Sequence, residues 1–97
     1  MAIKERTYPI DEGTLGAINS AFDAGDCDEI CMAIGTVLQK RNVSEVARAS
    51  GIKRETIHRA FISGETHPNL RTLVVVLAAI GLKIQVRPKG RSSRAKP

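Results

Sequence analysis

Aromatic residues are scarce in this sequence, which has two Phe, one Tyr and no Trp among its 97 residues. Proteins that bind single-stranded nucleic acid usually stack the bases on aromatic side chains, so this class is disfavoured. Long apolar runs are missing as well, because the longest, residues 73–80, is far shorter than the roughly 20 residues of a membrane span. The first residues also lack the apolar core of a signal peptide, and we therefore expect a cytoplasmic protein without a membrane partner.

The residue sets that catalysis and metal binding require are also absent from the sequence. The two cysteines, Cys27 and Cys31, are four residues apart on one expected helix, which suits a disulfide poorly and favours a reducing compartment. A zinc site formed by these cysteines with His58 and His67 is disfavoured, because the four residues lack the paired spacing of structural zinc sites. No nucleophile with a neighbouring base is evident. We predict a protein that is not an enzyme and that binds no metal or cofactor.

Charge is distributed unevenly along the chain, whose net charge is +5. Residues 1–39 contain two basic and seven acidic side chains, and residues 40–71 contain seven basic and three acidic ones. Residues 72–97 contain six basic side chains and no acidic one. This gradient favours two partners of opposite charge, although the acidic segment can also be read as a solvated helical surface.

Apolar residues recur at helical spacing in five segments, which predicts an all-α, five-helix bundle. The segments are residues 15–22, 26–40, 44–50, 54–62 and 70–80. Gly25 and Gly81 are placed to end the first and last helices, and Asn42 is a candidate left-handed terminator. The candidate N-caps are Asp26, Ser44 and Asn69.

The bundle is flanked by two segments of different composition. We expect a short arm over residues 1–10, a folded domain over residues 11–87, and a basic disordered tail over residues 88–97. Apolar and polar residues alternate over residues 82–87, which predicts a short half-buried strand at the end of the domain. A single strand leaves its backbone groups unpaired, so its partner is either residues 3–8 or the same strand of a second copy.

Small and apolar residues between Ser44 and Gly64 fit a helix-turn-helix. Ala47 faces the crossing of the two helices, and Gly51 supplies the left-handed residue of the turn. The other positions that fit the motif are Val46, Ile52, Ile57 and Ala60. The alternative is an ordinary pair of packed helices.

The polar residues of this segment are candidates for contacts with double-stranded DNA. In a helix-turn-helix the second helix enters the major groove, with its N-terminal residues directed towards base edges. Arg binds guanine, Glu accepts from cytosine, and the Thr methyl meets thymine. Helix N-termini and loop residues can hold phosphates. The predicted DNA-binding residues are Ser44, Lys53, Arg54, Glu55, Thr56, Arg59, Thr66 and His67. For Glu55 and His58, a solvated helix face is an equal alternative.

About two-thirds of the chain, from Phe22 to Val86, resembles the Cro/C1-type helix-turn-helix antidote proteins of addiction modules, which are HigA-like type II antitoxins. Four features carry the resemblance: the acidic-Gly-Asp stop and start at residues 23–26, the helix and glycine of residues 44–51, the Arg54–Glu55 pair, and the closing segment of residues 68–82.

The resemblance implies a five-helix DNA-binding homodimer that represses its own operon and binds a RelE/ParE-superfamily toxin. Lys53 and His58 depart from the family pattern, in which Ser and Tyr are usual, and the basic tail is unusual as well. One alternative is a stand-alone regulator, of orphan or prophage type, with no toxin partner. Another is an interaction module that mainly masks a toxin. A neighbouring gene for a small basic protein would separate these alternatives.

Overall fold

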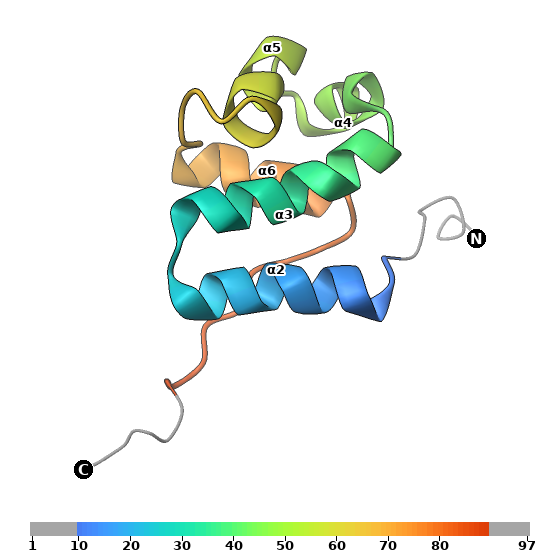
Figure 1. Cartoon of the computed structure of the whole chain (residues 1–97). Coiled ribbons are helices and arrows are strands. Elements are labelled where there is room, and N and C mark those ends of the chain that lie inside the picture. Colours follow the sequence, from blue (N-terminus) through green and yellow to red (C-terminus); the bar gives the residue numbers. More distant parts are fainter. Residues whose placement is uncertain (1–9, 90–97) are drawn as a thin grey trace.

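The structure, a computed structural model, describes residues 10–89, which form five helices. In chain order these are α2 (Glu12–Ala24), α3 (Cys27–Lys40), α4 (Val43–Ser50), α5 (Arg54–Ile57), which continues into the π-helical turn η1 (His58–Ile62), and α6 (Leu70–Ala79). α2 and α3 form an antiparallel pair, α6 lies behind α3, and α4 and α5 lie together at one end of the bundle (Figure 1). The predicted all-α class is confirmed. None of these helices is long and apolar enough to cross a membrane.

The core lies between α3, α4, η1 and α6, where their apolar faces meet. Its largest fully buried side chains are Ile34, Leu38, Ile57, Val76 and Ile80. Burial of Val46, Ile57 and Ala60 confirms the inward faces that the sequence predicted for the third and fourth segments. α3 and η1 approach each other closely at Gly35, where a Cβ atom would overlap the carbonyl oxygen of Phe61.

Most helix ends lie where the sequence predicted them. Gly25 ends α2 in a left-handed conformation with φ 72°. Asp26 caps α3 by accepting hydrogen bonds from the amides of Asp28 and Glu29 at 3.0 and 3.2 Å. Asn69 caps α6 by accepting from the amide of Thr72 at 2.8 Å. These caps confirm the predicted end of the first helix and the predicted starts of the second and last helices, whereas the first helix begins at Glu12 and not at residue 15.

The predictions for Asn42 and Ser44 are wrong. Asn42 has extended backbone (φ −134°, ψ 115°), and its side-chain oxygen accepts from the amides of Ser44 and Glu45 at 2.9 and 3.3 Å. Asn42 is therefore the N-cap of α4, and Ser44 lies inside the first turn. The physical reason is the short connection after α3: because that helix continues to Lys40, the extended residue that starts the next helix falls at Asn42.

The predicted strand over residues 82–87 is not confirmed, because residues 82–89 form no strand with any described part of the chain. The amide of Leu82 donates to the carbonyl of Leu77 at 2.8 Å, and its side chain packs against the core. Ile84 and Val86 are exposed, Val86 to 94%. The possible partner segment 3–8, with most of the predicted arm, lies outside the described residues, as does the predicted tail from residue 90.

Candidate nucleic-acid interface

The candidate interface is built on α4, the turn at Gly51, and α5. Gly51 ends α4 with φ 76°, a left-handed conformation that glycine adopts without a Cβ penalty, and its amide donates to the carbonyl of Ala47 at 2.9 Å. Beyond the turn, Ile57 is fully buried against the core. Because Ile57 fixes the inward face of α5, the polar side chains on the other faces of this helix are directed to solvent.

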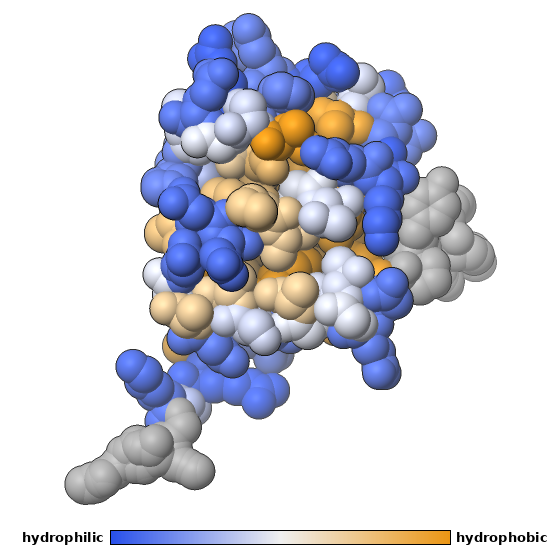
Figure 2. All heavy atoms as spheres, viewed as in Figure 1, coloured by the Kyte–Doolittle hydropathy of each residue, from blue (hydrophilic) through white to orange (hydrophobic). Residues whose placement is uncertain are grey.

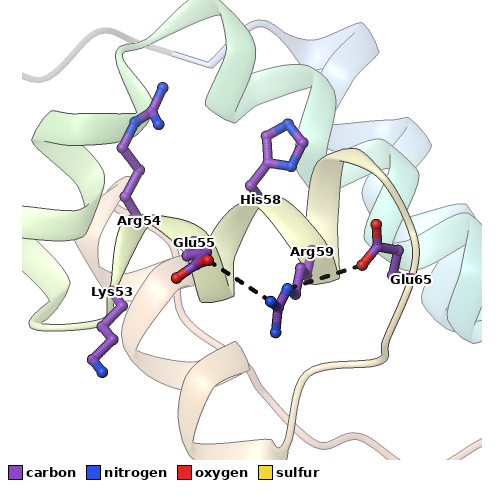
Figure 3. Close-up of a pocket in the computed structure, with 6 residues that line it drawn as sticks. All are labelled: Lys53, Arg54, Glu55, His58, Arg59 and Glu65. Atoms are coloured by element: carbon purple, nitrogen blue, oxygen red, sulfur yellow. Dashed lines mark ion pairs between the residues drawn. The ribbon is translucent and has the colours of Figure 1, made fainter.

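An open depression runs along α5, η1 and the loop that follows them (Figure 3). It is lined by Lys53, Arg54, Glu55, His58, Arg59 and Glu65. Arg54 and His58 project from one side of the helix, whereas Glu55 and Arg59 project from another (Figure 3). The structure therefore brings together four of the predicted DNA-binding residues: Lys53, Arg54, Glu55 and Arg59.

Arg59 lies between two carboxylates in this depression. Its Nη2 atom is 3.7 Å from Glu55 Oε2, one helical turn earlier, and its Nε atom is 3.9 Å from Glu65 Oε1 in the loop. All three side chains are more than half exposed, so each pair is weak and screened by salt. The guanidinium of Arg59 is therefore shared between two acids, and it can still be released to another partner.

Glu65 is a site residue that the sequence analysis missed. It lies six residues after Arg59 with no helical spacing to it, so no sequence pattern relates the two. The loop turns back because the amide of Thr66 donates to the carbonyl of Arg59 at 3.3 Å. His58 also lines the depression, although the sequence left its role open.

The remaining predicted contact residues lie outside the depression. Ser44 is exposed in the first turn of α4, but Asn42 already accepts its amide proton. Thr56 and Thr66 are exposed on α5 and on the loop. His67 is directed to the start of α3, where its Nε2 lies 2.8 Å from Asp28 Oδ1. His67 is therefore paired with a carboxylate in the free protein, and its contact with DNA stays a prediction.

Charge changes sign along the depression. Lys53 and Arg54 stand at the N-terminal end of α5, where the positive end of the helix dipole adds to their charge. Towards the loop, the single guanidinium of Arg59 lies between the carboxylates of Glu55 and Glu65. An anion such as a phosphate is therefore attracted mainly to the start of α5, whereas the Glu55 carboxylate can accept from a base amino group.

The cysteines show no sign of a metal site. Within residues 10–89, no group of three or more His, Cys, Asp or Glu side chains is placed to hold a metal ion. Cys27 and Cys31 are free thiols, the first exposed and the second buried. Burial, followed by the neighbouring Cys27 and Asp28, raises the pKa of the Cys31 thiol. Cys31 therefore stays protonated near neutral pH and packs as a small apolar residue.

Comparison with known proteins places these features in a family context. The model of a family described as probable addiction module antidote proteins matches residues 10–88. An uncharacterized protein of Haemophilus influenzae is 33% identical over 70 residues, which cover 72% of this chain and 71% of the relative. No solved structure matches the chain significantly. The family match includes the whole of α2 to α6 and therefore every residue that lines the depression.

Proposed function

The chain belongs to the family of probable addiction module antidote proteins, and we propose that it is the antitoxin of a type II toxin–antitoxin module. In this proposal the antitoxin also binds its own operator and thereby represses its operon. In this proposal α4 and α5 are a Cro/C1-type helix-turn-helix, and the toxin is of the RelE/ParE type. The observation that carries DNA binding is the solvent-facing start of α5. Lys53 and Arg54 stand there beside Glu55, while Ile57 anchors the opposite face in the core.

The exposed side of α5 is suited to the major groove. Placed there, its first residues face base edges, so Arg54 can bind guanine and Glu55 can accept from cytosine N4. Thr56 offers a methyl group to thymine, and Lys53 can neutralise a phosphate. These contacts use side chains that are exposed in the free protein. No rearrangement of the core is needed to form them.

The opposite, acidic part of the molecule is suited to a basic toxin. Asp23 and Glu29 are exposed on α2 and α3 and are not among the residues that line the depression. Over α2 and α3, Figure 2 shows a belt of neutral and weakly apolar side chains bordered by hydrophilic ones. Met32 of α3 is 70% exposed and offers an apolar anchor among these acids. The acidic side chains of α2 and α3 repel the phosphates of DNA, so the toxin and DNA would occupy different surfaces of the protein.

The experiment that tests this proposal measures the two activities separately. The duplex is the DNA upstream of the gene, and the protein partner is the product of the neighbouring gene. Arg54→Ala should cost about 1–3 kcal/mol of operator binding and leave toxin binding unchanged, because Arg54 is exposed and away from α2. Asp23→Lys with Glu29→Lys should slow association with the toxin and spare the operator.

The outcomes separate the alternatives. If Arg54→Ala abolishes both activities in a folded protein, the two surfaces coincide and the division proposed above is wrong. Toxin binding without binding of any duplex selected from a random pool would leave an interaction module. Operator binding without a toxin partner would leave a stand-alone regulator.

A further inference from the structure

We propose that Glu65 is a positioning residue for DNA specificity, which holds Arg59 so that it reads a base and not a phosphate. The inference rests on the proposed function, since it concerns how the same depression distinguishes operator from unrelated DNA. Glu65 is not one of the DNA-binding residues that the sequence predicted. Its role follows from its contact with Arg59, which the fold creates.

The geometry divides the guanidinium of Arg59 into two parts. Glu65 lies against Nε, on the side of the group nearest the helix, whereas Glu55 lies against the terminal Nη2 atom. The two acids approach from different elements, Glu55 from α5 and Glu65 from the loop (Figure 3). At 3.7 and 3.9 Å both contacts are longer than a charge-assisted hydrogen bond, so either acid can release Arg59 without unfolding the helix.

On a matching sequence the two acids act differently. Glu55 can move to the amino group of a cytosine, which frees the terminal nitrogens of Arg59 to bind a guanine bidentately. Glu65 stays on Nε and keeps the planar fork oriented towards the base edge. Arg59 therefore reads a base without first losing both of its partners.

On unrelated DNA the same acids work against binding. No matching base draws Glu55 away, so Arg59 stays between two carboxylates and contributes little charge to the phosphates. Glu65 thus lowers non-specific affinity while it supports the specific contact, and the operator is preferred as a result.

The test is Glu65→Gln, measured with the upstream duplex and with an unrelated duplex of equal length over a range of salt concentrations. The ratio of operator to unrelated affinity should fall by about twofold to fivefold. The salt dependence on unrelated DNA should steepen by up to about one unit, because Arg59 becomes free for a phosphate. Glu65 is exposed, so circular dichroism should show an unchanged fold.

Two controls distinguish positioning from a general change in charge. Glu12→Gln removes the same charge from α2, far along the chain and exposed, and should leave the affinity ratio unchanged. In an Arg59→Ala background, Glu65→Gln should change neither the ratio nor the salt slope. An unchanged ratio in Glu65→Gln, an equal fall in Glu12→Gln, or a fall that persists without Arg59 would each overturn the inference.

Failure of the proposed function gives a different result. Wild-type protein that does not prefer the upstream duplex would contradict operator recognition itself. The contact between Glu65 and Arg59 would then still be tested on unrelated DNA, where Glu65→Gln but not Glu12→Gln should steepen the salt dependence. Equal salt dependences of Glu65→Gln and Glu12→Gln on unrelated DNA would then overturn the inference that Glu65 holds Arg59.

Discussion

At the residue scale, Arg54 and Arg59 are chemically identical and differ only in their surroundings. Arg59 lies between Glu55 and Glu65, whereas Arg54 forms no ion pair with any described residue. Arg54 is therefore available to a phosphate or a base, and Arg59 must exchange one partner for another. Two arginines that the sequence predicts to be exposed on the same helix therefore differ in how readily they can bind DNA.

A second contrast at this scale concerns the two polar residues at the start of α4. We expect Asn42→Ala to lower the free energy of unfolding by about 1 kcal/mol, because two amides lose their acceptor. Ser44→Ala is the matched control and should change stability much less, since Ser44 is exposed within the first turn and is no cap. Urea unfolding of both variants measures the difference.

The reverse order of the two effects would contradict the assignment of Asn42 as the cap. It would restore Ser44 as the residue that starts the helix, as the sequence alone suggested.

At the scale of elements, the stability of the proposed recognition helix depends on its contact with α3. α5 has four residues and continues directly into η1, where the amide of Ser63 donates to the carbonyl of His58 at 2.9 Å. This wide turn lies where the Phe61 carbonyl meets the backbone of Gly35. π-turns often mark functional sites, and here the turn anchors the helix that carries the arginines. A firmly held helix keeps such side chains in register with their partner.

Two glycines within helices provide a direct test of this contact. Gly35→Ala should cost about 3 kcal/mol of stability, because the new Cβ would overlap the Phe61 carbonyl oxygen and force α3 and η1 apart. Gly16→Ala is the control: nothing lies within 4 Å of the added Cβ, and stability should rise by about 0.5–1 kcal/mol. Thermal unfolding of the two variants compares them.

A neutral effect of Gly35→Ala would show that α3 and η1 are not in backbone contact. Loss of stability in Gly16→Ala would show instead that alanine destabilises this chain even at an open helical glycine. The cost of Gly35→Ala could then not be assigned to the contact between α3 and η1.

At the scale of the whole molecule, the exposed apolar side chains near the end of the domain favour a second copy of the chain. Val86 is 94% exposed and Ile84 40%, and residues 82–89 form no strand with any other described segment. Backbone groups of this kind are normally paired. A two-fold dimer would pair them, and reading of two adjacent major grooves likewise requires two recognition helices about 34 Å apart.

We therefore expect a dimer at micromolar concentration, and Val86→Asp should convert it to a monomer by placing a charge in the paired strands. The control is Met32→Asp, which changes another exposed apolar residue, on α3, and should leave the dimer intact. Sedimentation equilibrium measures both. If the second copy and not the arm pairs with residues 82–87, deletion of residues 1–9 should also leave the dimer intact.

Wild-type protein that sediments only as a monomer, with and without DNA, would contradict the dimer. Loss of the dimer on deletion of residues 1–9 would assign the strand to the arm.

The sequence by itself determined the helices and most of their ends. The spacing of Ile34, Leu38 and Ile57 predicts which faces are buried, and all three lie in the core. Gly25 and Asp26 end one helix and start the next at the predicted positions. Periodicity and capping involve residues within about one helical turn, so they can be read from a short stretch of chain.

Only the tertiary structure decided which of the exposed residues act together. Glu65 meets Arg59 because a loop turns back, and His67 meets Asp28 although 39 residues separate them. The contact of Gly35 with Phe61 likewise joins two helices. Such contacts depend on how distant segments pack, and local propensity does not encode the distance between segments that are far apart in the chain. For this reason the sequence identified Arg59 as a candidate for DNA binding, but only the fold showed that Glu65 also contacts it.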